Sequence, residues 1–370
     1  MSAAGSSKKL SMQHVPALVC ALALMVMAQN GNAYNYFTCA NGKTLDFNSG
    51  YMTFNYANNL TGAQKAAIST GLSRVTAFSD SHITTIDNND SSFGQGNGQS
   101  EIYRGDISTA DCSAWFIVST CAVTEADIRF GNETWTTTDN SQHYPFSPGR
   151  SMTGTAVHEG GHCIGMAHSN DRYNMMGSDW NHVTRNGTAT YYGPGEDLSN
   201  GLIDLHGKKS AQNNYRDVGV TVFRYLGVSG EYSTHKFGVL RDGSGTTLTT
   251  VGSYEGQPIY EVMAGIPIQM EITLENNGES DTENPNVGVY LSTNSVISAD
   301  DTPVGSPVAF TLERDSPTET TVTVTIPSTT APGNYFLGAY VDHDDLISET
   351  TSANNIAYYP IAVIAAPPGC

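Results

Sequence analysis

The segment HEGGHCIGMAH, residues 158–168, carries side chains that can hold and use a metal ion. His158 and His162 are four residues apart, so on a helix both imidazoles lie on one face and can bind the same ion. Gly165 permits the backbone to leave the helix and turn, which brings His168 round as a third ligand. Three imidazoles leave one coordination position open for water, as in a catalytic zinc site. We therefore expect one catalytic Zn²⁺ ion here.

Glu159 lies beside the first histidine, and helical geometry makes it a poor fourth ligand. It is well placed to take a proton from a metal-bound water, which makes it the expected general base of a hydrolytic reaction. The extended pattern, with its glycine and third histidine, arises by chance with a probability below about one in ten thousand. Gly160 and Gly161 each cost the helix about 1 kcal/mol relative to alanine, so we expect close packing or metal binding to offset them.

The elements that must position this motif can be predicted from periodicity. Met52, Phe54 and Tyr56 alternate with polar residues, which predicts a half-buried strand. Thr61 and Gln64 have capping-box spacing, and Ile68, Leu72 and Val75 then share one face of a helix. We also expect strands at 81–87, 113–120 and 125–130, an exposed loop at 87–100, and a helix at 151–164. The first half therefore combines a sheet with helices.

The second half of the chain has a different pattern of residue types. From about Tyr215, short runs rich in Val, Thr, Ile and Tyr are separated by Gly, Pro, Asn and Asp, with no helical periodicity. This pattern predicts an all-β sandwich with its own core. We expect four segments: a signal peptide at 1–33, a first domain at 34–210, a β-rich connector or first sandwich strands at 211–255, and the sandwich at 256–366.

The N-terminus predicts export from the cell. Lys8 and Lys9 precede an apolar stretch at 15–28, and the ending Gly31-Asn32-Ala33 suits a signal peptidase, so the mature chain is expected to begin at Tyr34. The apolar stretch is too short for a comfortable membrane span, and we expect no transmembrane segment. The formal net charge of -19 would repel nucleic acids and anionic lipids, so nucleic-acid binding is not expected. We predict a secreted, extracellular protein.

Removal of the signal peptide leaves five cysteines, and an oxidising compartment permits disulfides among them. They are Cys39, Cys112, Cys121, Cys163 and Cys370. Cys112 and Cys121 flank a short strand, so a local disulfide between these two is the first prediction. A bond between Cys39 and Cys163 is the second choice, and Cys370 would then be free or its tail processed.

The extended motif resembles the signature of the metzincin zinc endopeptidases, in which a methionine beneath the metal follows the third histidine. Met176 comes eight residues after His168, the spacing of the matrixin branch, and Met175 is the alternative. Ser169 is matrixin-like as well.

Two further segments are similar to matrixins, the run at 125–130 and the run at 196–207, so the resemblance covers roughly 34–208. It implies an α+β catalytic domain, with a twisted mixed sheet and an active-site helix, ahead of the all-β immunoglobulin-like sandwich. The calcium loops of many matrixins are not recognisable, which leaves structural Ca²⁺ open.

The resemblance implies a secreted zinc endopeptidase that cuts extracellular protein or peptide substrates with a zinc-bound water and Glu159 as general base. Trp180, Tyr191 and Tyr192 lie in the segment 177–194 and are expected to wall the pocket for the residue after the cut. Packing beneath a long loop is the alternative role for these aromatic side chains.

The second half has a resemblance of its own. The segments 274–293 and 326–361 are similar to the immunoglobulin-like, cell-adhesion-related domain of many bacterial exported proteins. Such domains usually bind a ligand or serve as spacers between other domains, and the resemblance therefore implies a polymeric or cell-surface ligand. The alternative for the whole chain is an extracellular adhesion or matrix-binding protein with a vestigial zinc site. The joint presence of Glu159, the three histidines and Met176 argues against it.

Overall fold

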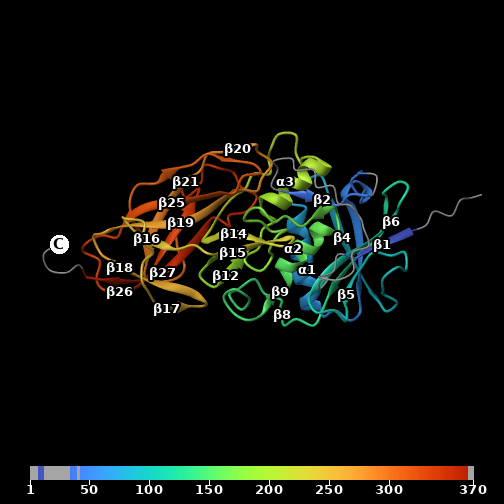
Figure 1. The fold of residues 1–370 in the computed structure, drawn as a ribbon, viewed down its shortest axis with the longest axis horizontal. Helices are drawn as coiled ribbons and strands as arrows, with labels where there is room; N and C mark the ends of the chain where they lie inside the picture. The colour runs from blue at the N-terminus through green and yellow to red at the C-terminus, as the bar shows by residue number, and fades with distance from the viewer. Residues whose placement is uncertain (1–6, 12–33, 40–41, 366–370) are drawn as a thin grey trace, which may run out of the picture.

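The computed structural model describes residues 7–11, 34–39 and 42–365. The ribbon has an α+β part, which contains the three α-helices of the described residues, and an all-β part that follows it (Figure 1). The predicted signal peptide lies outside the described residues, except for Ser7–Ser11, which form strand β1. Cys370 also lies outside them. No helix in the described ranges is long and apolar enough to cross a membrane.

A six-stranded sheet forms one side of the first part, in the order β1-β6-β7-β5-β3-β4. The bounds are β1 Ser7–Ser11, β3 Tyr51–Ala57, β4 His82–Asp90, β5 Glu101–Arg104, β6 Ala110–Ile117 and β7 Val123–Phe130. The sheet is mixed, because β3 runs parallel to β4 and β5, β5 runs parallel to β7, and β6 runs antiparallel to β7. The strand predicted to end at Asp87 continues to Asp90, so the expected loop begins later.

Three helices cover this core: α1 Gly62–Val75, α2 Met152–His162 and α3 Gly195–His206. The capping box predicted for α1 is present, since Thr61 Oγ1 accepts from the Gln64 N–H at 3.3 Å and Gln64 Oε1 accepts from the Thr61 N–H at 2.9 Å. The predicted apolar face of α1 is buried. It packs against α2, the helix that carries the metal-binding motif.

Short elements connect these layers. They are β2 Asn35–Tyr36, the 3-10 turn η1 Asn48–Gly50, β8 Trp135–Thr136, β9 Arg150–Ser151, β10 Met166–Ala167, β11 Thr184–Asn186 and β12 Ala189–Tyr191. Strand β2 pairs with β10, so the residues directly after the predicted cleavage point lie against the chain that leaves α2.

Two sheets make up the second part. The smaller sheet contains β13 Val218–Thr221, β16 Leu240–Asp242, β19 Pro267–Asn276 and β25 Thr318–Thr325. The larger contains β17 Thr250–Tyr254, β18 Gln257–Met263, β21 Asn286–Ser292, β22 Thr302–Pro303, β23 Val308–Ala309, β26 Gly333–Val341 and β27 Ile356–Ile364. The second part also contains two short pairs of strands: β14 Phe223–Ser229 with β15 Tyr232–Phe237, and β20 Thr282–Glu283 with β24 Leu312–Glu313. Alternate residues of both sheets share one buried core, which makes this part a β-sandwich.

The two halves have separate cores that meet at a polar junction. Glu196 in α3 accepts hydrogen bonds from the N–H groups of Asn276 and Ser316 in the sandwich. His182 lies 3.0 Å from Glu275, and both side chains are buried. The halves are therefore joined by buried hydrogen bonds as well as by the chain itself.

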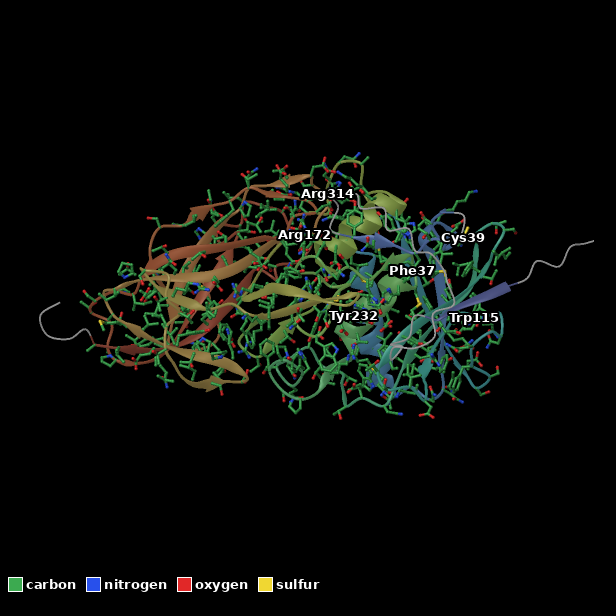
Figure 2. The ribbon with its side chains drawn as sticks, viewed as in Figure 1. Phe37, Cys39, Trp115, Arg172, Tyr232 and Arg314 are labelled. Atoms are coloured by element: carbon green, nitrogen blue, oxygen red, sulfur yellow. A yellow bond between two sulfur atoms is a disulfide. The ribbon has the colours of Figure 1, made fainter. Side chains whose placement is uncertain are left out.

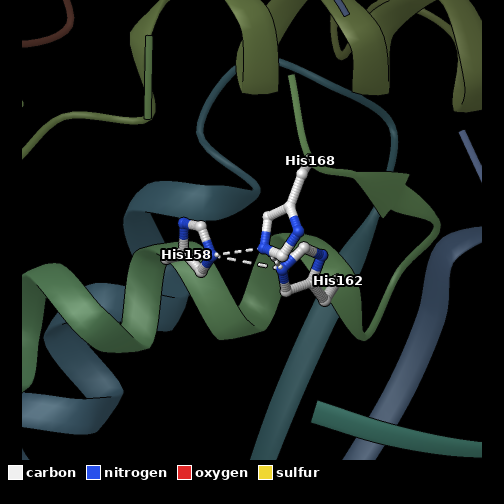
Figure 3. A group of neighbouring side chains, drawn as sticks. All are labelled: His158, His162 and His168. Atoms are coloured by element: carbon white, nitrogen blue, oxygen red, sulfur yellow. Dashed lines mark hydrogen bonds between the residues drawn. The ribbon is translucent and has the colours of Figure 1, made fainter. Parts of the chain in front are cut away.

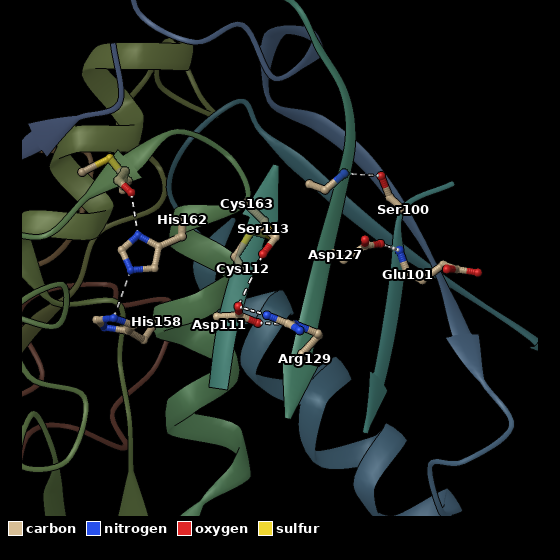
Figure 4. The surroundings of a disulfide bond; sticks show 12 residues. Ser100, Glu101, Asp111, Cys112, Ser113, Asp127, Arg129, His158, His162 and Cys163 are labelled. Carbon is tan, nitrogen blue, oxygen red and sulfur yellow. Dashed lines mark hydrogen bonds and ion pairs between the residues drawn. A yellow bond between two sulfur atoms is a disulfide. The ribbon is translucent and has the colours of Figure 1, made fainter. Parts of the chain in front are cut away.

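The predicted Cys112–Cys121 disulfide is wrong. The structure pairs Cys112 with Cys163 and Cys39 with Cys121, and the first of these bonds ties β6 to the end of α2 beside His162 (Figure 4). The reason is the extended strand between the two residues. At about 3.3 Å per residue, β6 spans about 17 Å from Cys112 to its end at Ile117. Cys121 lies at that far end, where its N–H donates to the Ile117 carbonyl, and is too distant for a disulfide with Cys112. The second choice, Cys39 with Cys163, is excluded by the same two bonds.

Candidate metal centre

Helix α2 places its histidines as the spacing predicted. Ser151 caps its N-terminus, with Oγ accepting from the Gly154 N–H at 3.0 Å. Gly161 lies where the helix meets the segment after His168: a Cβ there would lie 2.8 Å from both Met176 Sδ and Leu198 Cδ1. Close packing therefore accounts for this glycine within a helix.

The chain turns sharply after α2. Gly165 has φ +120°, a conformation that side chains with a Cβ rarely adopt. Met166 and Ala167 then form β10, and Asn35 Nδ2 donates to the His168 carbonyl at 3.1 Å. The turn and the N-terminal segment together bring His168 back to the helix (Figure 3).

The three imidazoles meet through their Nε2 atoms. The Nε2–Nε2 distances are 3.1 Å for His158 and His162, 3.0 Å for His162 and His168, and 3.3 Å for His158 and His168. A tetrahedral zinc with Zn–N bonds near 2.05 Å requires separations of about 3.3 Å. The geometry therefore fits the predicted ion.

Hydrogen bonds at the opposite ring nitrogens set the tautomers. His158 Nδ1 lies 2.9 Å from the Met175 carbonyl and His162 Nδ1 lies 2.7 Å from the Met166 carbonyl. Because a carbonyl oxygen only accepts, each Nδ1 must carry the proton, and each Nε2 presents a bare lone pair. Lone pairs that converge at this distance repel one another unless a cation lies between them, so the donor set is suited to bind a metal ion.

The segment predicted as the methionine turn lies beneath the site. Met175 and Met176 are fully buried, and their N–H groups donate to Asp197 Oδ1 at 2.9 Å and Oδ2 at 2.7 Å. Met176 packs against Gly161, while the Met175 carbonyl orients His158. Sequence reasoning missed the role of Asp197; the signal available was an acidic residue in the first turn of a helix.

Burial at the site favours neutral histidine and raises the pKa of the adjacent carboxyl. Burial lowers the pKa of His158 to about 4, so this imidazole is neutral at physiological pH. Glu159 is only 5% exposed, and burial, followed by the charges of Asp111 and Asp179, raises its pKa well above the usual range, against the opposing effect of Arg150.

A buried ion pair borders the centre. Arg150 Nη2 donates to Asp179 Oδ2 at 2.8 Å, and Thr155 Oγ1 donates to the same oxygen at 2.9 Å. Trp180 lies against this pair, with the Arg150 guanidinium 4.7 Å from its ring centre. Burial alone would raise the pKa of Asp179, but Arg150 outweighs it and keeps the carboxyl ionised.

The three aromatic residues predicted to wall a pocket do not come together in one place. Trp180 and Tyr192 line the same small hollow beside Arg150 and Asp179. Tyr191 lies instead under the Arg74 guanidinium, 4.4 Å from it, and faces a cavity of about 20 Å³ at the junction of the halves. The substrate pocket remains a proposal, and Tyr191 lies apart from Trp180 and Tyr192.

The second half also reaches the centre. The tip of the β14–β15 hairpin brings Glu231 Oε2 to 3.4 Å from His168 Nδ1 and the Tyr232 ring to 4.4 Å, between centroids, from the His168 ring. Figure 2 shows Tyr232 where this hairpin meets the first half. Sequence reasoning missed both residues, because nothing in their local pattern points to a histidine in another domain.

Three histidines that could hold a metal ion, with an adjacent carboxyl, have the composition of an open, catalytic type of metal site. Comparison with known families agrees: residues 63–190 match the family model Matrixin, and residues 250–358 match the CARDB model. The Matrixin match contains the three histidines, Glu159 and Met176. The two matches fall on the two halves whose motifs predicted a matrixin-like segment and a cell-adhesion-related domain.

Among curated proteins, no relative matches this chain. Among solved structures, the CARDB domain of a Pyrococcus furiosus protein, in complex with di-metal ions, is 16% identical; the match covers 40% of this chain and 90% of that one, with a TM-score of 0.25. A Niemann-Pick type C2 protein from the Japanese carpenter ant is 11% identical, with 34% and 93% covered and a TM-score of 0.23.

Proposed function

We propose that this protein is a secreted zinc-dependent endopeptidase that hydrolyses peptide bonds of extracellular proteins. The observation that carries the proposal is the convergence of the Nε2 atoms of His158, His162 and His168 beside the buried carboxyl of Glu159. The Matrixin match over the same residues supports the same class of reaction.

In the proposed mechanism, a zinc ion held by the three histidines would polarise the scissile carbonyl and lower the pKa of a bound water toward 7. Glu159 accepts the proton of the attacking water and passes it to the leaving amine. The enclosed setting of Glu159 suits this exchange, because a desolvated carboxyl holds a proton more readily than an exposed one. Met175 and Met166 hold two of the ligands in the required tautomer through their carbonyls.

We further propose that residues 34–210 catalyse, that 211–255 connect the halves, and that 256–366 bind a polymeric or cell-surface ligand. The CARDB match supports an adhesion-related role for the last segment. The signal-like N-terminus and the two disulfides support secretion.

The test compares wild-type protein with Glu159→Ala and with Glu313→Ala, a control that removes an exposed glutamate far along the chain. Zinc content is measured by elemental analysis, and cleavage is profiled on a proteome-derived peptide library with and without chelator. Glu159→Ala should retain zinc and lose turnover by several orders of magnitude, whereas the control should match the wild type.

Cleavage that survives exhaustive chelation would overturn the zinc mechanism. A zinc-loaded wild type that cleaves no peptide but binds a polymer through its second half would instead favour the adhesion interpretation.

A further inference from the structure

The β14–β15 hairpin extends from the sandwich and forms hydrogen bonds with the loop that follows the third histidine. Asn170 Nδ2 donates to the Gly230 carbonyl at 2.8 Å, and Tyr225 Oη donates to the Asn170 carbonyl at 3.0 Å. Further along the loop, Asn181 Nδ2 donates to the His235 carbonyl at 2.7 Å. Both arms of the hairpin therefore hold the segment from the third ligand through the methionine turn.

The base of the hairpin is anchored on the other side. Thr273 Oγ1, on β19 of the sandwich, donates to the Phe223 carbonyl at 2.7 Å, and Glu319 on β25 accepts from the Tyr225 N–H at 2.6 Å. Phe223 itself is buried in the core of the first half. The hairpin is thus a bridge whose position depends on both domains.

The ligands differ in what orients them. His158 and His162 are rigid members of α2, and backbone carbonyls of the first half accept from their Nδ1 atoms. His168 lies beyond the turn, where no helix holds it, and the partner described for its Nδ1 is the Glu231 carboxylate of the second half. The Tyr232 ring packs on the same imidazole. The Glu231 carboxylate, 3.4 Å from Nδ1, favours the tautomer in which His168 directs an unprotonated Nε2 at the other two ligands.

We propose that the hairpin completes the metal centre, with Glu231 and Tyr232 as positioning residues for His168. This inference rests on the proposed function only in taking the bound ion to be zinc. Its consequence is that metal affinity, although all three ligands belong to the first half, depends on a hairpin supplied by the second.

The experiment measures zinc dissociation constants of the full-length protein by competition with a chromogenic chelator. Glu231→Ala should weaken zinc binding about tenfold, the lower end of the range for outer partners of metal-bound histidines, because the side chain is 57% exposed. Glu231→Gln keeps an acceptor oxygen and should lose less. Tyr232→Ala should weaken binding several-fold, while Tyr232→Phe keeps the ring contact, loses only the hydroxyl that bonds to Glu231, and should weaken binding less.

Two measurements separate positioning from general destabilisation. Thermal unfolding of the metal-free variants should match the wild type, and Glu313→Gln, a surface charge removal in the same half, should leave zinc affinity unchanged. The visible spectrum of the Co²⁺-loaded protein should shift in Glu231→Ala, because the field of one ligand changes.

Wild-type zinc affinity and an unchanged Co²⁺ spectrum in both alanine variants would overturn the inference. A wild-type protein that binds no zinc would overturn the inference and the proposed function together. A wild type that binds zinc and cleaves nothing would overturn only the proposed function, since the affinity comparison does not use activity.

Discussion

Asp197 should be the residue on which the methionine turn depends. Its two carboxylate oxygens accept from the N–H groups of Met175 and Met176, at 2.9 and 2.7 Å, and the Met175 carbonyl in turn orients His158. The side chain is fully buried at the start of α3. Asp197→Ala therefore leaves two buried N–H groups without an acceptor and releases the support of one metal ligand.

The magnitude follows from those two donors. A buried N–H without a partner costs about 1–3 kcal/mol, so the pair costs about 2–6 kcal/mol. Burial raises the pKa of Asp197 to about 6, which means that the ionised carboxylate is unfavourably desolvated. Its removal relieves this desolvation and offsets part of the loss in the free energy of unfolding. We expect a net loss in the free energy of unfolding of about 2–4 kcal/mol at pH 8, where the carboxylate is ionised.

Urea denaturation at pH 8 measures this loss, and chelator competition measures the accompanying change in zinc affinity, about tenfold. Asp197→Asn keeps one acceptor oxygen and should fall between wild type and alanine. Asp300→Ala, at an exposed position, is the control and should change stability by less than about 0.5 kcal/mol. A loss below about 1 kcal/mol for Asp197→Ala, with unchanged zinc affinity, would refute the role assigned to this carboxylate.

Two other predictions concern covalent and ionisable groups. The double variant Cys112→Ala/Cys163→Ala removes a disulfide that closes a loop of sequence separation 51, and its free energy of unfolding in urea should fall by about 4 kcal/mol. Non-reducing peptide mapping that found Cys112 joined to Cys121 would contradict the pairing. Burial raises the pKa of Glu349 to about 7, above its value of about 4.3 in the unfolded chain, so its contribution to stability is full at low pH and is lost as pH rises through 7. Glu349→Gln should therefore flatten the decline in melting temperature between pH 5 and 8, and an equally steep decline in the variant would count against this.

The elements near the motif could be predicted because their causes are local. The capping box of Thr61, the apolar face of α1, the alternating strand at Tyr51–Ala57 and the turn at Gly165 each depend on residues within a few positions of one another. The disulfide prediction failed for the opposite reason. Proximity in sequence suggested Cys112 with Cys121, but an extended strand separates neighbours and packing joins Cys112 to a helix 51 residues further on.

The sequence by itself determined the ligand set, because the spacing of His158, His162, Gly165 and His168 acts through the 3.6-residue period of one helix and one turn. It also determined the change from an α+β half to a β-sandwich, which periodicity and turn residues record directly. Only the tertiary structure decided what supports the ligands: Asp197 beneath Met176, Cys112 beside the end of α2, and Glu231 and Tyr232 against His168. These contacts join segments far apart in the chain, and they form only when two separate cores are packed, so no local pattern can encode which residues will meet.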